Sequence, residues 1–246
     1  MCLIVFAWQV VPGAPLIAAA NRDEFYDRPA AAACAWPENP KVFGGRDLQG
    51  GGSWMGITQE GPHGARFAAL TNIRGPQERR TDAPSRGALV ADYLAGDLSA
   101  AEYIAKITSG SEAYNGFNLV LGDREKLFWY SNRGGDDERN GKELAPGIYG
   151  ISNSLLDEPW PKVVRTKAEF ASLLCQGAPE DAFFEMLADT TRAPDMRLPD
   201  TGIALDLERV LSAVCIETTG YGTRTSTVVK LYNDAPAELH ERVLQA

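Results

Sequence analysis

The sequence has few of the residues that build metal centres and redox sites. It contains two histidines, His63 and His240, so a site with several imidazole ligands is nearly excluded. Its four cysteines lie far apart and form no CxxC pair, which is not the spacing of a zinc site. They are Cys2, Cys34, Cys175 and Cys215. We therefore expect no metal.

Positive charge and long apolar runs are also scarce. Lys and Arg number 24 against 33 Asp and Glu, giving a formal net charge of -9 and no general attraction to nucleic acid or to anionic membranes. No run approaches the roughly 18 apolar residues that cross a bilayer, so no transmembrane segment is expected. The short apolar start has no basic segment before it and does not resemble a secretory signal. We expect a cytoplasmic protein, or one in an organelle lumen reached by a signal that we do not recognise.

Turn residues are plentiful, with 24 Gly and 15 Pro spread along the chain. They separate short apolar runs in the manner of β-hairpins. Residues 3–8 and 16–20 flank the turn VVPGAP, and Trp54–Thr58 and Arg66–Ile73 flank QEGPHG. A third hairpin is expected from 213–218 and 223–232 around TGYG. Further strands are expected at 116–122, 126–132 and 147–154.

Helical spacing of apolar residues appears between these strands. Helices are expected at 84–95, with Ser85 as N-cap, and at 99–108, 160–175, 180–188 and 205–214, with a short helix at the C-terminus. Hairpins and helix pairs thus alternate in blocks. This order favours an α+β fold of stacked antiparallel sheets with helices outside. Without a repeat or a linker, we expect one domain over residues 1–246.

Cys2 is the first candidate for chemistry. If Met1 is removed, Cys2 carries a thiol and a free α-amine, whose pKa of about 7.7 to 8.0 lets a neutral fraction take the thiol proton. Nucleophile and base then need no histidine, as in a threonine activated by its own terminal amine. The alternative is that Cys2 is a small buried side chain at the start of a strand.

A polar cluster, NRDE, ends the second strand of the first hairpin. Hairpin pairing could bring it beside residues 2–4. Arg22 could hold a carboxylate or lower the pKa of the thiol, and Asp23 could accept a hydrogen bond from the terminal ammonium. Alternatively, the cluster is a surface turn with an ordinary ion pair.

Asparagines and one arginine stand at the ends of other strand-like runs. Asn72, Asn118 and Asn153 carry side-chain amides, which are standard donors to a developing oxyanion. Asparagine is also a common turn residue. Arg224, near the start of a late strand, could anchor an anionic group or cap a sheet edge.

Eight segments together resemble the NRDE family, also called the transport and Golgi organization protein 2 family, in order over nearly the whole chain. They are MCLIVFAW, AANRDEF, GGRDLQGGGSWMGIT, FAALTNIR, YNGFNLVLGD, NRGG at 132–135, YGISNSLLDEPWPK and YGTRTSTVV. The resemblance implies the four-layered αββα sandwich of the N-terminal nucleophile hydrolases. Within that group the family looks most like the branch with penicillin V acylase and bile salt hydrolase, which cleaves linear, non-peptide C–N amides.

The resemblance also implies roles for individual residues. Cys2 would be the nucleophile, with its own amine as base, and Asp23 would orient that amine. Asn72 and Asn153 would contribute to the oxyanion hole and to substrate contacts, and Arg224 would support the nucleophile. Such hydrolysis needs no cofactor.

Substrate contacts are expected from Arg22, Asn21 and Trp54, which would form the wall of a cleft for a small or amphipathic ligand. A tryptophan is more often part of a core. The branch has its arginine a few residues before the aspartate, whereas here Arg22 adjoins Asp23.

The family has also been associated with Golgi organisation and with the handling of haem. Haem iron usually takes His, Cys, Met or Tyr as its protein ligand. Here His63 is expected in a turn and His240 in the terminal helix, and there is no CxxCH. A carrier could instead use an apolar cleft and an arginine for a propionate. Two hypotheses therefore stand: a cysteine amidohydrolase, and a non-catalytic binding or trafficking protein for haem or another amphipathic ligand. The sequence carries no signal for the oligomeric state.

Overall fold

A computed structural model describes residues 2–59, 63–76 and 80–245 of the chain. Its first sheet has five antiparallel strands in the order β10-β1-β2-β11-β12. The strands are β1 (Cys2–Val11), β2 (Ala14–Phe25), β10 (Gly147–Ile151), β11 (Tyr221–Leu231) and β12 (Glu238–Val243). Because β1 and β2 lie inside the sheet and are covered on both faces, β1 and the first seven residues of β2 are almost continuously apolar.

The second sheet has seven antiparallel strands in chain order from β3 to β9. They are β3 (Ala30–Trp36), β4 (Asn39–Asp47), β5 (Met55–Thr58), β6 (Arg66–Asn72), β7 (Phe117–Gly122), β8 (Leu127–Ser131) and β9 (Lys142–Glu143). Each strand pairs with the next one along the chain, so this sheet is a meander.

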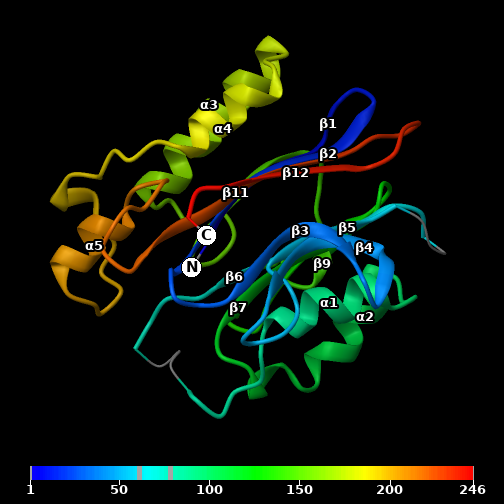
Figure 1. The fold of residues 1–246 in the computed structure, drawn as a ribbon, viewed down its shortest axis with the longest axis horizontal. Helices are drawn as coiled ribbons and strands as arrows, with labels where there is room; N and C mark the ends of the chain where they lie inside the picture. Colours follow the sequence, from blue (N-terminus) through cyan, green and yellow to red (C-terminus); the bar gives the residue numbers. More distant parts are fainter. Residues whose placement is uncertain (1, 60–62, 77–79, 246) are drawn as a thin grey trace.

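Helices cover the two outer faces of the stacked sheets (Figure 1). Helices α3 (Pro161–Gln176) and α4 (Glu180–Leu187) lie over the first sheet, and α1 (Gly87–Ala95) and α2 (Ala100–Thr108) lie over the second. A further helix, α5 (Leu205–Leu211), packs at one end. The expected α+β sandwich of two antiparallel sheets with outer helices is confirmed.

The two faces of β1 show how the sequence divides between layers. Ile4, Phe6 and Trp8 point into the core between the sheets, whereas Leu3 and Val5 pack under α3 and α4. Since side chains alternate along a strand, Cys2 points to the same side as Ile4, toward the second sheet. The apolar run behind the thiol therefore holds it at the end of a central strand.

Three expectations about elements were wrong. The C-terminal segment is strand β12 rather than a helix, because it extends the sheet beside β11. Residues 213–218 form only an isolated bridge from Glu217 to Gly222, since β11 pairs with β2 and β12 instead. Helix α1 begins at Gly87 with Arg86 at its N-cap, and the Ser85 hydroxyl donates to the Gly51 carbonyl.

Sequence periodicity also missed β3 and β4. Their exposed small and polar residues carry little apolar alternation, so the pairing with β5 decides their structure. Within the described residues, no helix is long and apolar enough to span a membrane.

Candidate active site

Cys2 and Arg22 are direct partners across the β1–β2 ladder. Cross-strand partners project from the same face of a sheet with their Cβ atoms about 5 Å apart. Both side chains are buried, and both line a cavity of about 390 Å³ at the end of the sandwich. The hairpin thus brings together the thiol and the cation that the sequence suggested.

The thiol itself is in a dry environment. Burial raises the pKa of Cys2, and the positive charge of Arg22 acts against that rise. A raised pKa means that the resting group is the neutral thiol, so nucleophilic attack needs a base. The α-amine proposed as that base depends on removal of Met1, and residue 1 lies outside the described residues.

Asp23 is 1% exposed and lies next to the cross-strand partner of Cys2. Its Oδ1 accepts a hydrogen bond of 2.7 Å from the Thr223 hydroxyl on β11. Burial raises the pKa of Asp23, and the positive charge of Lys162 opposes this rise. The carboxylate therefore lies in the wall of the Cys2 cavity, where the sequence expected an orienting acceptor.

Lys162 was not expected at this site. It is the second residue of α3, it is 1% exposed, and its Nζ has no hydrogen-bond partner within the described residues. Burial lowers the pKa of Lys162 to about 8, against the effect of Asp23, which raises it. Its position within EPWPK gave no signal, because an amphipathic helix usually presents its lysines to water.

Asn72 and Asn153 line different cavities. Asn72 ends β6 and lines the Cys2 cavity, and its side-chain amide has no hydrogen-bond partner in residues 2–59, 63–76 and 80–245. Asn153 follows β10 and lines a different cavity, with Arg74. Its Nδ2 donates to the Asn72 carbonyl at 2.9 Å. Ser152, next to it, donates to the Cys2 carbonyl at 3.1 Å. Asn72 thus faces the thiol's cavity, and Asn153 holds Asn72.

Arg224 lies away from the thiol. It occupies a bulge in β11, between Thr223 and Thr225, and its guanidinium donates to the carbonyls of Phe25 and Arg28. It is absent from the residues that line the Cys2 cavity. Its contacts brace the turn that follows β2.

Of the two other expected substrate contacts, Trp54 lines the cavity and Asn21 does not. Asn21 faces the helices: its amide donates to the carbonyls of Leu187 and Val214, and its Oδ1 accepts from Ser226. The structure therefore does not bring Asn21 to the cavity. Trp54 does line it, with the Arg22 guanidinium 4.3 Å above its ring.

Three charged residues of the cavity were missed by sequence reasoning: Arg28, Asp47 and Arg86. Asp47, at the end of β4, accepts a hydrogen bond of 2.9 Å from Nε of Arg28 and lies 2.8 Å from its Nη2 as an ion pair. It also accepts hydrogen bonds from the backbone of Gln49 and Gly50. Burial acts to raise the pKa of Asp47, but the hydrogen bond and charge of Arg28, together with the backbone hydrogen bonds, outweigh it and hold the pKa low. The GGRD part of the segment GGRDLQGGGSWMGIT carried the signal for Asp47, but only as an unassigned part of the family motif.

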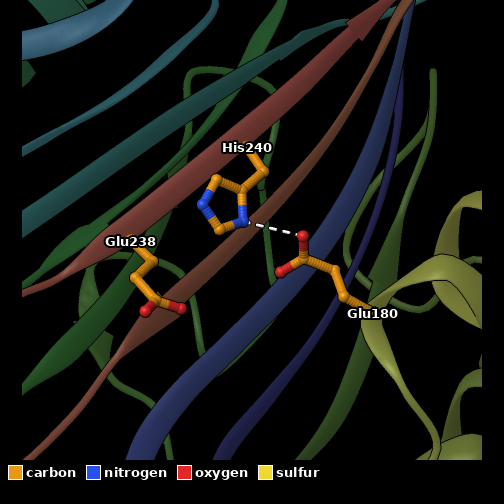
Figure 2. A group of neighbouring side chains, drawn as sticks. All are labelled: Glu180, Glu238 and His240. Atoms are coloured by element: carbon orange, nitrogen blue, oxygen red, sulfur yellow. Dashed lines mark hydrogen bonds and ion pairs between the residues drawn. The ribbon is translucent and has the colours of Figure 1, made fainter.

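A candidate metal cluster lies far from this cavity in the sequence and in the fold. Glu180, Glu238 and His240 approach one another where the start of α4 meets β12 (Figure 2). Glu180 already binds His240 at 2.7 Å and Lys230 at 2.9 Å, and Glu238 accepts from Tyr232. The lysine supplies the positive charge that a metal would bring, so this is an ion-pair network between helix and strand.

The histidines do not offer a haem ligand at the cavity. His63 contacts the Asp97 carbonyl, and His240 pairs with Glu180 on β12 rather than in the expected helix. Neither lines the Cys2 cavity. Among the described residues that line this cavity, the Cys2 sulfur is the only usual haem ligand.

Comparisons with known proteins agree with the sequence motifs. The family model of Transport and Golgi organisation 2 matches residues 1–246. The chain is 39% identical to the Transport and Golgi organization protein 2 homolog of Bos taurus over 263 residues, which cover 98% of this chain and 92% of that protein. Identity to the Homo sapiens homolog is 36%, with the same coverage. Identity to Transport and Golgi organization protein 2 of Drosophila melanogaster is 32% over 273 residues, covering 98% of this chain and 90% of that protein. The resemblance predicted from the motifs is confirmed.

Proposed function

The chain belongs to the Transport and Golgi organisation 2 family, and from this premise we propose that it is a cysteine amidohydrolase of the N-terminal nucleophile type. Its substrate would be a linear, non-peptide amide of a small or amphipathic molecule. Cys2 is the nucleophile, and its α-amine, exposed by removal of Met1, is the base.

One observation supports this proposal above the others. Cys2, Arg22, Asp23 and Asn72 come from three strands in both sheets and line one cavity. A buried thiol that served only packing would not need a cation, a carboxylate and an unpaired amide around it. Charged groups are costly to bury beside a thiol, so their convergence on one cavity favours chemistry.

The reaction follows from these groups. The neutral amine takes the thiol proton as Sγ attacks the amide carbonyl carbon, and the oxyanion forms beside the Asn72 amide. The C–N bond breaks as the ammonium returns its proton to the leaving nitrogen, which leaves a thioester. Water, losing a proton to the same amine, then attacks the thioester. Sγ departs and regains that proton, and a carboxylic acid is released.

The decisive experiment combines N-terminal mass analysis with labelling of Cys2. Intact-mass measurement must show loss of Met1, and an acyl electrophile must label Cys2 faster than the exposed Cys34. The Cys2→Ala variant should abolish rapid labelling, and Cys34→Ser should leave it unchanged. Retention of Met1, or equal labelling of the two thiols, would refute the proposal.

The second candidate is non-catalytic binding of haem or another amphipathic ligand. The observation that favours it is the burial that raises the pKa of Cys2, because a neutral thiol suits a passive wall better than a nucleophile. Haem titration followed by the Soret band in wild type and Cys2→Ala tests it. Saturable haem binding by a protein whose Cys2 is not labelled by the acyl electrophile would favour this candidate.

A further inference from the structure

The Arg22 guanidinium is a buried cation with unused hydrogen-bonding capacity. Its side chain is 5% exposed, and Nη1 has no hydrogen-bond partner within residues 2–59, 63–76 and 80–245. Its carboxylate neighbours, Glu24 and Asp47, are 3.9 Å from Nη2, too far for a hydrogen bond. A guanidinium offers five N–H donors, so this environment leaves it undersatisfied.

The surroundings fix the position of this cation. Its Cζ lies 4.3 Å from the centre of the Trp54 ring, which covers one side of it. A carboxylate binds to the edge of a guanidinium through two parallel hydrogen bonds, and stacking on an aromatic ring does not block that edge. Because Arg22 faces Cys2 across the ladder, a ligand held at this edge lies beside the thiol.

The second arginine of the same wall behaves differently. Arg28 already donates to Asp47 at 2.9 Å through Nε and contacts the same oxygen at 2.8 Å through Nη2. In this ion pair the charges of Arg28 and Asp47 neutralise each other. The third arginine of the lining, Arg86, donates to the Gly116 carbonyl at 3.0 Å. Arg22 therefore keeps an unpartnered Nη1 for an added anion, and Arg28 is its matched control.

We propose that Arg22 is a carboxylate-recognition residue, and that the substrate is an amide bearing a carboxylate close to the scissile bond. This inference rests on the proposed nucleophilic role of Cys2. It narrows the substrate class from small amides in general to anionic amides, such as N-acyl amino acids. Arg22 would then select substrates that carry a carboxylate at the binding step, before Cys2 attacks.

Two alkylating reagents of nearly equal size test the recognition directly. Iodoacetamide is neutral and iodoacetate carries a carboxylate, and both are attacked by sulfur with loss of iodide. The iodoacetate-to-iodoacetamide rate ratio at Cys2, divided by that at Cys34 in the same molecule, measures charge preference free of reagent reactivity. We expect a value of about ten or more, as for a charge-assisted hydrogen bond.

Variants assign the preference to one side chain. Arg22→Gln should bring the normalised ratio to about one, Arg22→Lys should give an intermediate value, and Arg28→Gln should keep most of the wild-type preference. A ratio near one in wild type, or one unchanged in Arg22→Gln, would overturn the inference. If Cys2 reacts with neither reagent faster than Cys34, the proposed nucleophile fails instead.

A binding measurement tests carboxylate recognition by Arg22 in a protein that lacks the Cys2 thiol. In the Cys2→Ala background, calorimetry compares N-hexanoylglycine with N-hexanoylglycinamide, which differ only in the terminal charge. We expect roughly tenfold tighter binding of the acid, lost when Arg22→Gln is added. Equal affinity for the two compounds would contradict the inference whatever the reactivity of Cys2. Thermal unfolding of each variant shows whether it is folded.

Discussion

The Asn153 side chain, which follows the edge strand of one sheet, donates a 2.9 Å hydrogen bond to the Asn72 carbonyl, at the end of a strand of the other sheet. This bond joins the two sheets beside the candidate nucleophile. Arg74 strengthens the junction, because its backbone N–H donates to the Asn153 carbonyl at 2.8 Å. The position of Asn72 in the cavity therefore depends on a residue outside it.

We predict that Asn153→Ala destabilises the protein and slows labelling of Cys2. Loss of a buried, hydrogen-bonded amide destabilises by about 1–3 kcal/mol. Urea unfolding measures the stability, and the acyl-labelling rate reports the site. Asn118→Ala is the control: Asn118 is equally buried, donates to Thr71 and Ser154, and does not line the Cys2 cavity. Equal slowing in both variants would show a general loss of stability rather than a role for Asn153.

Lys162→Met tests whether a buried ammonium is retained at the expense of stability. The folded pKa of about 8 lies below the ordinary 10.5, so the unfolded chain binds the proton more tightly. Wild type should gain stability as pH rises from about 8 to 10.5, by roughly 3 kcal/mol at most. The methionine variant lacks this gain and should be more stable near pH 7.

Urea unfolding of both proteins at pH 7 and pH 10 measures this difference. Lys167→Met on the same helix is the control, because Lys167 is partly exposed and pairs with Asp157. An identical pH trend in wild type and Lys162→Met would contradict the prediction.

Asp23→Asn should separate the effect of the carboxylate on protein stability from its effect on the reactivity of Cys2. Burial raises the folded pKa of Asp23 above 3.8, so its favourable contribution is present below that pH and is lost as pH rises through the folded pKa. The asparagine variant avoids this loss. Relative to wild type it should gain stability from pH 4 to pH 7, and Cys2 should label more slowly. Unchanged labelling in a stable variant would remove Asp23 from the mechanism.

Gly45→Ala tests how the wall of the cavity is built. A Cβ at Gly45 would lie 2.2 Å from the Trp54 ring, so the ring would have to move, at a cost of about 1–3 kcal/mol. Because Arg22 rests over that ring, the variant should also weaken the carboxylate preference. Gly110→Ala is the control, since a Cβ there meets nothing within 4 Å. Tryptophan fluorescence and the alkylation ratio measure the two effects, and an unchanged ratio would mean that Trp54 does not position Arg22.

Most of the fold could be predicted from the sequence, because its elements have strong local signals. The run after Cys2, the turn VVPGAP and the Ser99–Glu102 capping box of α2 each define structure over a few residues. The C-terminal segment failed because its burial comes from pairing with β11, which only the folded sheet supplies.

The candidate site was predicted in part for the same reason. Hairpin pairing between residues close in sequence correctly placed Arg22 beside Cys2. Alternation along β2 separates Asn21 from Arg22, but which face meets the cavity depends on how the sheets stack. Arg224 was displaced by a bulge in β11 that no sequence pattern announced.

The sequence by itself determined the family, the two-sheet architecture and the Cys2–Arg22 pair, because each depends on local periodicity or on motifs read in order. Tertiary structure alone decided that Lys162 is buried near Asp23 and that Asn153 holds Asn72. It also decided that Arg28 is hydrogen-bonded to Asp47, whereas Nη1 of Arg22 has no hydrogen-bond partner within the described residues. These relationships join segments from both sheets and their helices. Charge and hydrogen-bonding capacity can be read from a side chain, but whether they are satisfied depends on neighbours that only folding brings close.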